Sequence, residues 1–140
     1  MSECLTFEYQ VPGDDFTRAG EASSSVKNKL KMMGVDSGAI RRVAIAMYEG
    51  EINMVIHADG GAIKVMVTDD NIRIILADTG PGIPDVEKAM QLGYSTAPEE
   101  VRSLGFGAGM GLPNMKKYSD NMQIDTEVGV GTTVTMDIHL

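Results

Sequence analysis

One turn constrains this chain more than any other stretch: residues 78–83 have the sequence Asp-Thr-Gly-Pro-Gly-Ile. They follow residues 72–77, an apolar run that predicts a buried strand. Glycine admits positive φ and proline fixes its own φ, so a tight turn is expected there. Asp78, held at the end of a buried strand, can accept a hydrogen bond from a flat ligand that carries an amine. The alternative is an ordinary strand-to-helix turn in which Asp78 caps a local backbone group.

Length and charge restrict the class of protein. With 140 residues the chain predicts a single domain, residues 1–140, large enough for a hydrophobic core. Its net charge of −8 argues against sequence-independent binding to nucleic acid and against an anionic membrane surface. The single cysteine, Cys4, excludes an intramolecular disulfide and leaves no zinc cluster in view. No apolar run approaches the roughly 20 residues that span a bilayer, and the N-terminus lacks a signal-peptide pattern. We therefore expect a cytoplasmic enzyme or regulator.

The methionines supply core volume in a chain poor in aromatic residues. There are 11 Met and no Trp. A core rich in methionine is adaptable. The alternative use is a partner-binding surface.

The first third of the chain predicts an edge strand and a helix. Residues 4–11 alternate loosely and end at Pro-Gly, as edge strands do. Apolar residues at spacings of three and four then predict an amphipathic helix, capped by Asp14 or Asp15 and ending at Gly34. The serine run 23–25 is expected on the solvated flank of this helix.

A second helix is expected from a cap at Asp36 or Ser37 to about residue 58. Its apolar face is wide, so much of it should be buried. Polar residues on a buried helix cost free energy unless they find partners. The polar side chains of this helix are therefore expected to have bonding partners or a functional role.

Glu49, Asn53 and His57 lie four residues apart along one stripe of this second helix. Glu51 is about 160–200° away from Glu49 around the helix and is expected to be solvated. For His57 we expect a packing or hydrogen-bonding role rather than catalysis.

The remaining pattern predicts two hairpins and a short helix. A strand over 62–68, a tight turn at 69–71 and the strand ending at Asp78 form the first hairpin. A short helix follows within residues 84–92, and strands 121–127 and 131–138 close the chain. Helices and strands arrive in clusters, which predicts an α+β, two-layer sandwich. Its mixed, mostly antiparallel sheet should carry the helices on one face.

A glycine-rich loop precedes the helix expected to continue to Tyr118. Residues 105–112 are Gly-Phe-Gly-Ala-Gly-Met-Gly-Leu, and residues 93–108 before the helix have little apolar periodicity, as in a lid. A loop of this kind at a helix N-terminus presents backbone N–H groups to a phosphate. It matches neither a Walker loop nor a Rossmann fingerprint. The alternative is a flexible linker.

Three of these motifs together resemble the signatures of the Bergerat-fold (GHKL) ATPases, which include gyrase, Hsp90, histidine kinases and MutL. They are Glu49-x-x-x-Asn53, Asp78-x-Gly80-x-Gly82 and the loop 105–111, and the match covers nearly the whole chain. The run 94–102 and the closing Gly-Thr-Thr at 131–133 resemble the bacterial anti-sigma factor serine kinases and switch-protein kinases. The glycine loop is longer here than in the usual anti-sigma version.

The resemblance implies a role for each matched residue. Glu49 would be the general base toward a serine hydroxyl, and partial desolvation should raise its pKa. Asn53 would ligate Mg²⁺, and Asp78 would accept the adenine amino group, with Thr132 or Thr133 supporting it by a hydroxyl or a water. Arg102 would steady the transferring charge or meet the substrate protein. The residues implied to contact ATP are Asn53, Asp78, Gly80, Gly82, Ile83, Gly105, Gly107, Ala108, Gly109, Met110, Gly111, Leu112 and Thr132.

The function implied is an ATP-binding serine protein kinase and anti-sigma regulatory factor. It would use Mg-ATP to phosphorylate a serine on a small STAS-type antagonist protein. The alternative is a nucleotide-gated binding module that sequesters a sigma factor or activates a phosphatase without significant turnover. A homodimer is left open, with the first strand and helix as candidate surfaces. Mechanical work from ATP hydrolysis is disfavoured without a transducer domain.

Overall fold

The structure, a computed structural model, describes residues 4–12, 20–57, 60–80 and 111–140. The strands are β1 (Leu5–Pro12), β2 (Gly60–Val67), β3 (Asn71–Asp78), β4 (Asn121–Glu127) and β5 (Gly131–His139), and the helices are α1 (Glu21–Met32), α2 (Ser37–His57) and α5 (Gly111–Tyr118). The short helix predicted within 84–92 and the lid predicted at 93–108 lie outside the described residues.

The strands form one sheet in the order β1-β2-β3-β5-β4, so β1 is an edge strand as predicted. Every pairing between these strands is antiparallel, and no described pair supplies the parallel component expected of a mixed sheet. Two tight hairpins explain part of this result. In one, Thr68 N donates to the Asn71 carbonyl at 2.9 Å, and in the other Val130 N donates to the Glu127 carbonyl at 3.0 Å. Connections as short as these join only antiparallel strands.

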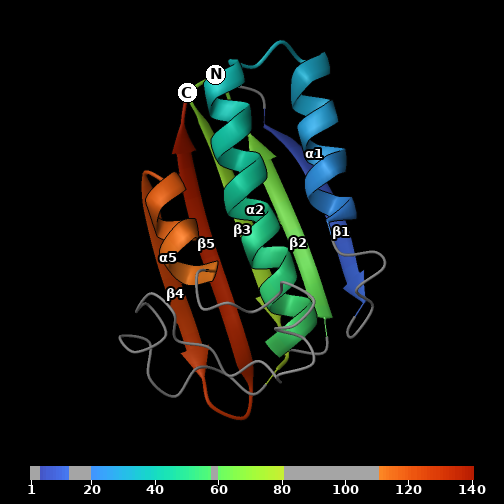
Figure 1. Ribbon diagram of the computed structural model, residues 1–140, viewed down its shortest axis with the longest axis vertical. Coiled ribbons are helices and arrows are strands. Elements are labelled where there is room, and N and C mark those ends of the chain that lie inside the picture. The colour runs from blue at the N-terminus through green and yellow to red at the C-terminus, as the bar shows by residue number, and fades with distance from the viewer. Residues whose placement is uncertain (1–3, 13–19, 58–59, 81–110) are drawn as a thin grey trace.

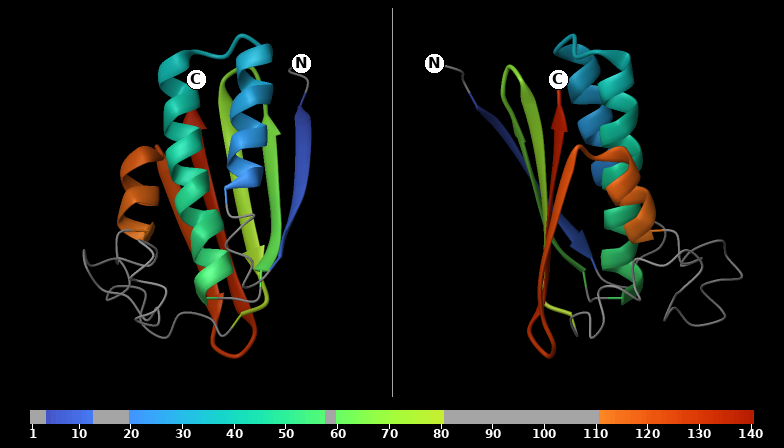
Figure 2. Two further views of the ribbon diagram at one scale, coloured as in Figure 1. Left: turned by 45° about the vertical axis from the view of Figure 1, so that its right-hand side comes forward. Right: turned by 90° about the vertical axis from the view of Figure 1, so that its left-hand side faces the viewer.

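The three helices lie on one face of the sheet, which gives the predicted two-layer α+β sandwich (Figures 1 and 2). Alternate residues of β2, β3 and β5 point toward the helices and are buried. They are Ile63, Val65, Val67, Ile72, Ile74, Leu76, Val134, Met136 and Ile138. The period of two along each strand therefore fills the space beneath the helices with branched side chains.

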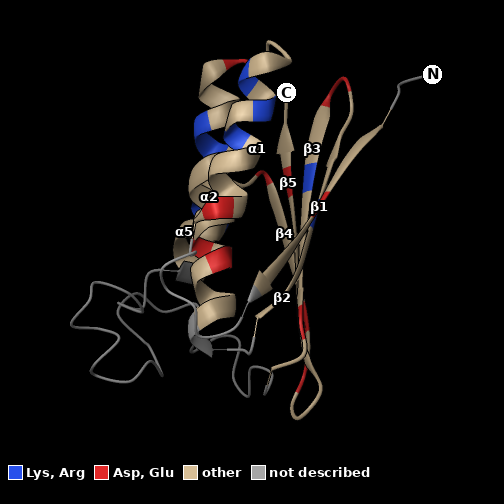
Figure 3. Cartoon of the chain, turned by 90° about the vertical axis from the view of Figure 1, so that its right-hand side faces the viewer, with Lys and Arg blue, Asp and Glu red and all other residues tan. Residues whose placement is uncertain are grey.

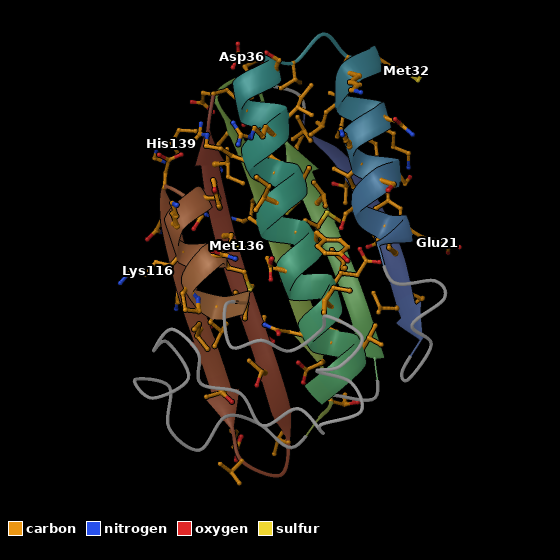
Figure 4. All side chains as sticks on the ribbon, in the orientation of Figure 1. Glu21, Met32, Asp36, Lys116, Met136 and His139 are labelled. Atoms are coloured by element: carbon orange, nitrogen blue, oxygen red, sulfur yellow. The ribbon has the colours of Figure 1, made fainter. Side chains whose placement is uncertain are left out.

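Four methionines, Met47, Met54, Met115 and Met136, belong to this core, as expected from the composition. Figure 4 shows Met136 in the interior and Met32 at the far end of α1, where Met32 is 88% exposed. No helix in the described ranges is long and apolar enough to cross a membrane.

Two predicted helix boundaries are confirmed and one is wrong. Asp36 Oδ2 accepts a hydrogen bond from Ala39 N at 3.2 Å and caps α2. Gly34, with φ of +77°, follows the end of α1 as the expected stop. The start of α1 differs, because the helix begins at Glu21 after an N-cap at Gly20 that offers no side chain. Asp14 and Asp15, the predicted caps, lie outside the described residues.

The face of the sheet away from the helices carries a polar cluster centred on Asp137 of β5. Arg73 donates to both carboxylate oxygens, with Nε to Oδ1 at 2.8 Å and Nη2 to Oδ2 at 3.2 Å, and Asn71 Nδ2 donates to Oδ1 at 3.1 Å. The hydrogen bond from Arg73 holds the pKa of Asp137 below its usual value. This cluster stabilises the sheet on the side opposite the helices.

Candidate functional site

Three elements converge at one end of the molecule. The C-terminal end of β3, the last turns of α2 and the first turn of α5 lie at the same end, beside the turn between β4 and β5 (Figures 1 and 2). The antiparallel order places β5 next to β3, so the start of β5 lies beside Asp78. The described parts of the motifs, Glu49 and Asn53 on α2, Asp78 at the end of β3 and Gly111 at the start of α5, therefore lie toward the same end of the molecule.

Asp78 is held by backbone donors from two segments. Its Oδ1 accepts from Gly80 N at 3.0 Å and from Thr132 N at 3.1 Å. The local cap considered from the sequence is therefore present, but it uses only one oxygen. Oδ2 accepts no hydrogen bond from the described residues. Asp78 thus has a fixed orientation and, within the described part of the chain, one carboxylate oxygen without a donor.

Glycines on both neighbouring strands allow the backbone to crowd around Asp78. Gly61 is paired with Asp78 in the sheet, and a Cβ on it would overlap the Ala77 carbonyl oxygen. Gly131 has φ of +151°, and a Cβ on it would overlap the Asp78 carbonyl oxygen. Only glycine tolerates both the conformation and the close approach at this position. This approach places Thr132 N within reach of the Asp78 carboxylate.

The Thr132 hydroxyl is used differently from the prediction. It lies 2.9 Å from the Thr126 hydroxyl of β4, and the Thr132 residue is buried. The backbone N–H of Thr132, and not its side chain, supports Asp78. The sequence analysis named Thr132 with its hydroxyl, whereas the group that contacts Asp78 in the structure is the backbone N–H.

Glu49 and Asn53 lie together on the side of α2 that faces α5. Asn114 Nδ2 lies 3.4 Å from Glu49 Oε1, a long contact, and Asn53 Nδ2 lies 3.9 Å from the sulfur of Met115. The Asn53 amide oxygen has no donor among the described residues. The predicted pair therefore lies on one side of α2, beside α5. Asn114, which the sequence analysis missed, is a polar residue at helical spacing after the glycine loop.

The pKa of Glu49 is raised above its usual 4.5 because burial disfavours the charged carboxylate. The hydrogen bond from Asn114 acts in the opposite direction and is the smaller effect. A carboxylate with a raised pKa is a better proton acceptor, which is what a general base requires. The expectation of a raised pKa from the sequence agrees with this geometry.

Glu51 is not solvated, and that prediction is wrong. Its side chain lies on the α1 side of α2, where the residue is 2% exposed. One oxygen accepts from Gly20 N at 2.9 Å and Ala22 N at 3.2 Å, and the other accepts from Ser23 N at 3.0 Å and Ser23 Oγ at 2.6 Å. Helices leave their first N–H groups without internal partners. Glu51 supplies the cap that Gly20 lacks.

The same contact makes the prediction of a solvated serine run wrong for Ser23, whereas Ser24 agrees with it. Ser23 is 6% exposed because its hydroxyl and amide both bind Glu51, while Ser24 is exposed. Ser25 is half-buried and lies 3.0 Å from the Tyr9 hydroxyl. The sequence carried a weak signal for this arrangement, since Ser23 is spaced to lie near Ala22 and Val26 at the edge of the apolar face.

The other predicted site residues divide into two groups. Gly111 begins α5 and Leu112, in its first turn, is buried in the core. His57 is the last residue of α2, and nothing is described for its side chain. Outside the described residues are Gly82, Ile83, Arg102, Gly105, Gly107, Ala108, Gly109 and Met110.

The donor and acceptor set suits a purine nucleotide with a hard cation. Asp78 offers a carboxylate oxygen to an exocyclic amine. Asn53 and Glu49 offer amide and carboxylate oxygens, the ligand type that Mg²⁺ prefers. Magnesium in nucleotide sites commonly takes few protein ligands and completes its shell with phosphate oxygens and water. The residues present therefore fit ATP with Mg²⁺.

Comparison with known proteins assigns the class. Residues 38–140 match the family of histidine kinase-, DNA gyrase B- and HSP90-like ATPases, and the chain belongs to that family. It is similar to the anti-sigma F factor of Geobacillus kaustophilus, with 33% identity over 97% of this chain and 90% of the relative. It is also similar to the serine/threonine-protein kinase RsbT of Bacillus subtilis, with 31% identity over 77% of this chain and 78% of the relative.

A solved structure agrees on the fold. The RsbU and RsbW domains of Rv1364c from Mycobacterium tuberculosis match with a TM-score of 0.61 at 17% identity, over 97% of this chain and 32% of that chain. The predicted family and fold class are therefore confirmed. The chain is an ATPase-family domain with anti-sigma factors and a serine/threonine kinase among its relatives.

Proposed function

We propose that this chain is an ATP-dependent protein-serine kinase that acts as an anti-sigma regulatory factor. Its substrate would be a serine hydroxyl on a small STAS-type antagonist protein, and a sigma factor would be its second partner. The observation that carries the proposal is Glu49, a partly buried carboxylate with a raised pKa, one helical turn from Asn53 and facing α5. Because sigma factors and their regulators meet in the cytoplasm, we place the activity there.

Each residue has a defined task in this reaction. Asp78 Oδ2 accepts a hydrogen bond from the adenine amino group, while Gly80 N and Thr132 N keep Oδ1 in place. Glu49 takes the proton of the serine hydroxyl as the serine oxygen bonds to the γ-phosphorus and the bond to the β-phosphate oxygen breaks. ADP and phosphoserine are the products. Asn53 would hold Mg²⁺, which supplies charge neutralisation to the phosphates when it is bound.

ATP affinity tests the nucleotide site first. Asp78→Asn should weaken ATP binding about 10- to 100-fold, because a hydrogen bond to a charged group contributes roughly 1.5–3 kcal/mol. Asp125→Asn is the matched control, since Asp125 is an exposed acid on β4 near the same end of the sheet. Calorimetry with and without Mg²⁺ measures both variants. Equal affinity in wild type and Asp78→Asn would contradict the proposed adenine contact.

Transfer to protein tests the reaction. Wild type with Mg-ATP and a purified STAS-domain protein encoded beside it should yield phosphoserine, detected by mass spectrometry. Nucleotide-dependent binding of that protein without phosphoserine would favour the binding-module alternative. The exposed Met32, Met33 and Tyr48 give that alternative an adaptable surface. Neither binding nor transfer, with ATP bound tightly, would overturn the choice of substrate.

A further inference from the structure

The Glu51 carboxylate joins the helix of the site to a second helix. Glu51 lies between Glu49 and Asn53 in the sequence, and each step along a helix turns about 100°, so its side chain lies about 200° around α2 from theirs. Its four hydrogen bonds all go to the first turn of α1. The two sides of α2 are therefore tied to different elements, α1 on one side and α5 on the other.

We propose that Glu51 is a positioning residue, which fixes the rotation of α2 about its axis and thereby directs Glu49 and Asn53 toward α5. The catalytic part of this inference rests on the function proposed above. Both carboxylate oxygens are occupied by the backbone N–H groups of Gly20, Ala22 and Ser23 and by the Ser23 hydroxyl, which specifies direction as well as distance. The Glu51 residue and the donors of Ala22 and Ser23 are buried, so water competes little for these three hydrogen bonds.

The anchor on the other side of this contact is itself fixed. The Tyr9 hydroxyl of β1 lies 3.0 Å from Ser25 Oγ of α1, and Lys29 Nζ donates to the same hydroxyl at 3.0 Å. The Lys29 ammonium also lies 4.6 Å from the centre of the Phe7 ring and 5.0 Å from the centre of the Tyr9 ring. Helix α1 is therefore bound to the edge of the sheet. A connection runs from β1 through α1 and Glu51 to α2.

At the level of Gly50, α2 packs closely against the sheet and α5 through its backbone. Gly50 faces β3, and a Cβ on Gly50 would lie 2.5 Å from Leu76 Cδ2 and 3.1 Å from Met115 Cε. Because Gly50 has no side chain, Leu76 of β3 and Met115 of α5 fill the space beside the α2 backbone, and this apolar contact carries no hydrogen bond that sets a direction. The polar contact at the next residue, Glu51, supplies the directional constraint.

Glu51→Gln tests the inference, with Asp137→Asn as the matched control. Both variants convert a buried, multiply bonded carboxylate to an amide of equal size, but Asp137 lies on the opposite face of the sheet. The first readout is the pair of side-chain amide NMR signals of Asn53 and Asn114, which needs no activity. The second is the split between kcat and KM for ATP. Ser23→Ala, which removes one of the four donors, is the milder variant if Glu51→Gln does not fold.

We expect Glu51→Gln to shift the Asn53 and Asn114 signals and to lower kcat about 10- to 100-fold, as small misplacements of a reacting group do. Affinity for Mg-free ATP should stay within about threefold of wild type, because Asp78 binds on β3. Asp137→Asn should change neither the signals nor kcat. Unshifted signals with full kcat in Glu51→Gln would overturn the inference. Shifted signals in a chain whose wild type transfers no phosphate would support the positioning role and reject the kinase instead.

Discussion

Glu49 and Glu51 lie two residues apart on α2, but their carboxylates have opposite surroundings. Glu51 is fully buried and accepts four hydrogen bonds from α1. Glu49 is half-buried, and its described donor is Asn114 at 3.4 Å. Burial with matching donors makes Glu51 a structural anchor. Burial without them raises the pKa of Glu49 and leaves a carboxylate ready to accept a proton.

The comparison shows how one helix serves two purposes. The basic and acidic residues of the helices are also separated along the length of the molecule. In Figure 3 most helical Lys and Arg lie toward the end away from the site, and Glu residues lie nearer to it. A buried acid is costly unless it is paired or hydrogen-bonded. In α2, Glu51 is fully hydrogen-bonded, whereas the uncompensated desolvation of Glu49 raises its pKa and makes it a stronger base.

The largest expected difference between the two acids is in catalysis. Glu49→Gln should lower the rate of phosphoryl transfer about 10²- to 10⁴-fold, because the amide cannot take the serine proton. ATP affinity should change little, since the adenine contact is at Asp78. Single-turnover transfer with saturating ATP measures the rate. A Glu49→Gln rate equal to wild type would mean that another group is the base.

A smaller difference is expected in folding stability, on the Glu51 side. Ser23→Ala removes the 2.6 Å donor to Glu51. Hydrogen bonds to charged groups contribute roughly 1.5–3 kcal/mol, and alanine regains about 0.5 kcal/mol of helix propensity, so a net loss of about 1–2.5 kcal/mol is expected. Ser24→Ala is the matched control on the same turn, exposed and expected to change stability by less than about 0.5 kcal/mol. Urea denaturation should give a lower midpoint for Ser23→Ala than for Ser24→Ala. Equal midpoints would show that the Ser23–Glu51 hydrogen bond does not contribute to stability.

Most of the fold follows from local signals in the sequence. The strand predicted at 62–68, the apolar run at 72–77 and the turn at 69–71 specify the hairpin β2–β3, which the structure contains. Asp36 and Gly34 act within a few residues of themselves, so their roles could be predicted. The antiparallel pairing of β3 with β5 joins residues far apart in the chain, and no local signal distinguishes it from a mixed sheet.

The site was predictable where a motif carries its own geometry. Glu49 and Asn53 share a helical stripe, and Asp78 ends a strand, so their placement follows from spacing alone. Glu51 was not predictable, because its partners are on α1, and the contact depends on how two helices pack. The spacing of Glu51 from Glu49 correctly placed the two side chains on opposite sides of α2. It could not show that the side of Glu51 is covered by α1.

The smallest expected effect is on the pH dependence of stability. Burial raises the pKa of Glu49 above 4.5, so the folded state binds this proton more tightly than the unfolded state. The stability of wild type relative to Glu49→Gln should therefore be greatest below pH 4.5 and should decline as pH rises through the folded pKa. The contribution of Asp137 to stability has the opposite pH dependence. Its pKa is lowered from 3.8, mainly by Arg73, so its contribution is full above pH 3.8 and is lost as pH falls toward the folded pKa.

Urea denaturation of wild type, Glu49→Gln and Asp137→Asn over a range of about pH 3 to 7 measures both signs in one series. The difference between wild type and Glu49→Gln should fall with rising pH, and the difference between wild type and Asp137→Asn should grow. Parallel curves for wild type and Glu49→Gln would mean that the carboxylate of Glu49 is as well solvated in the folded chain as in the unfolded one. In that case burial would not account for its capacity as a base, and the contrast with Glu51 would rest on hydrogen bonding alone.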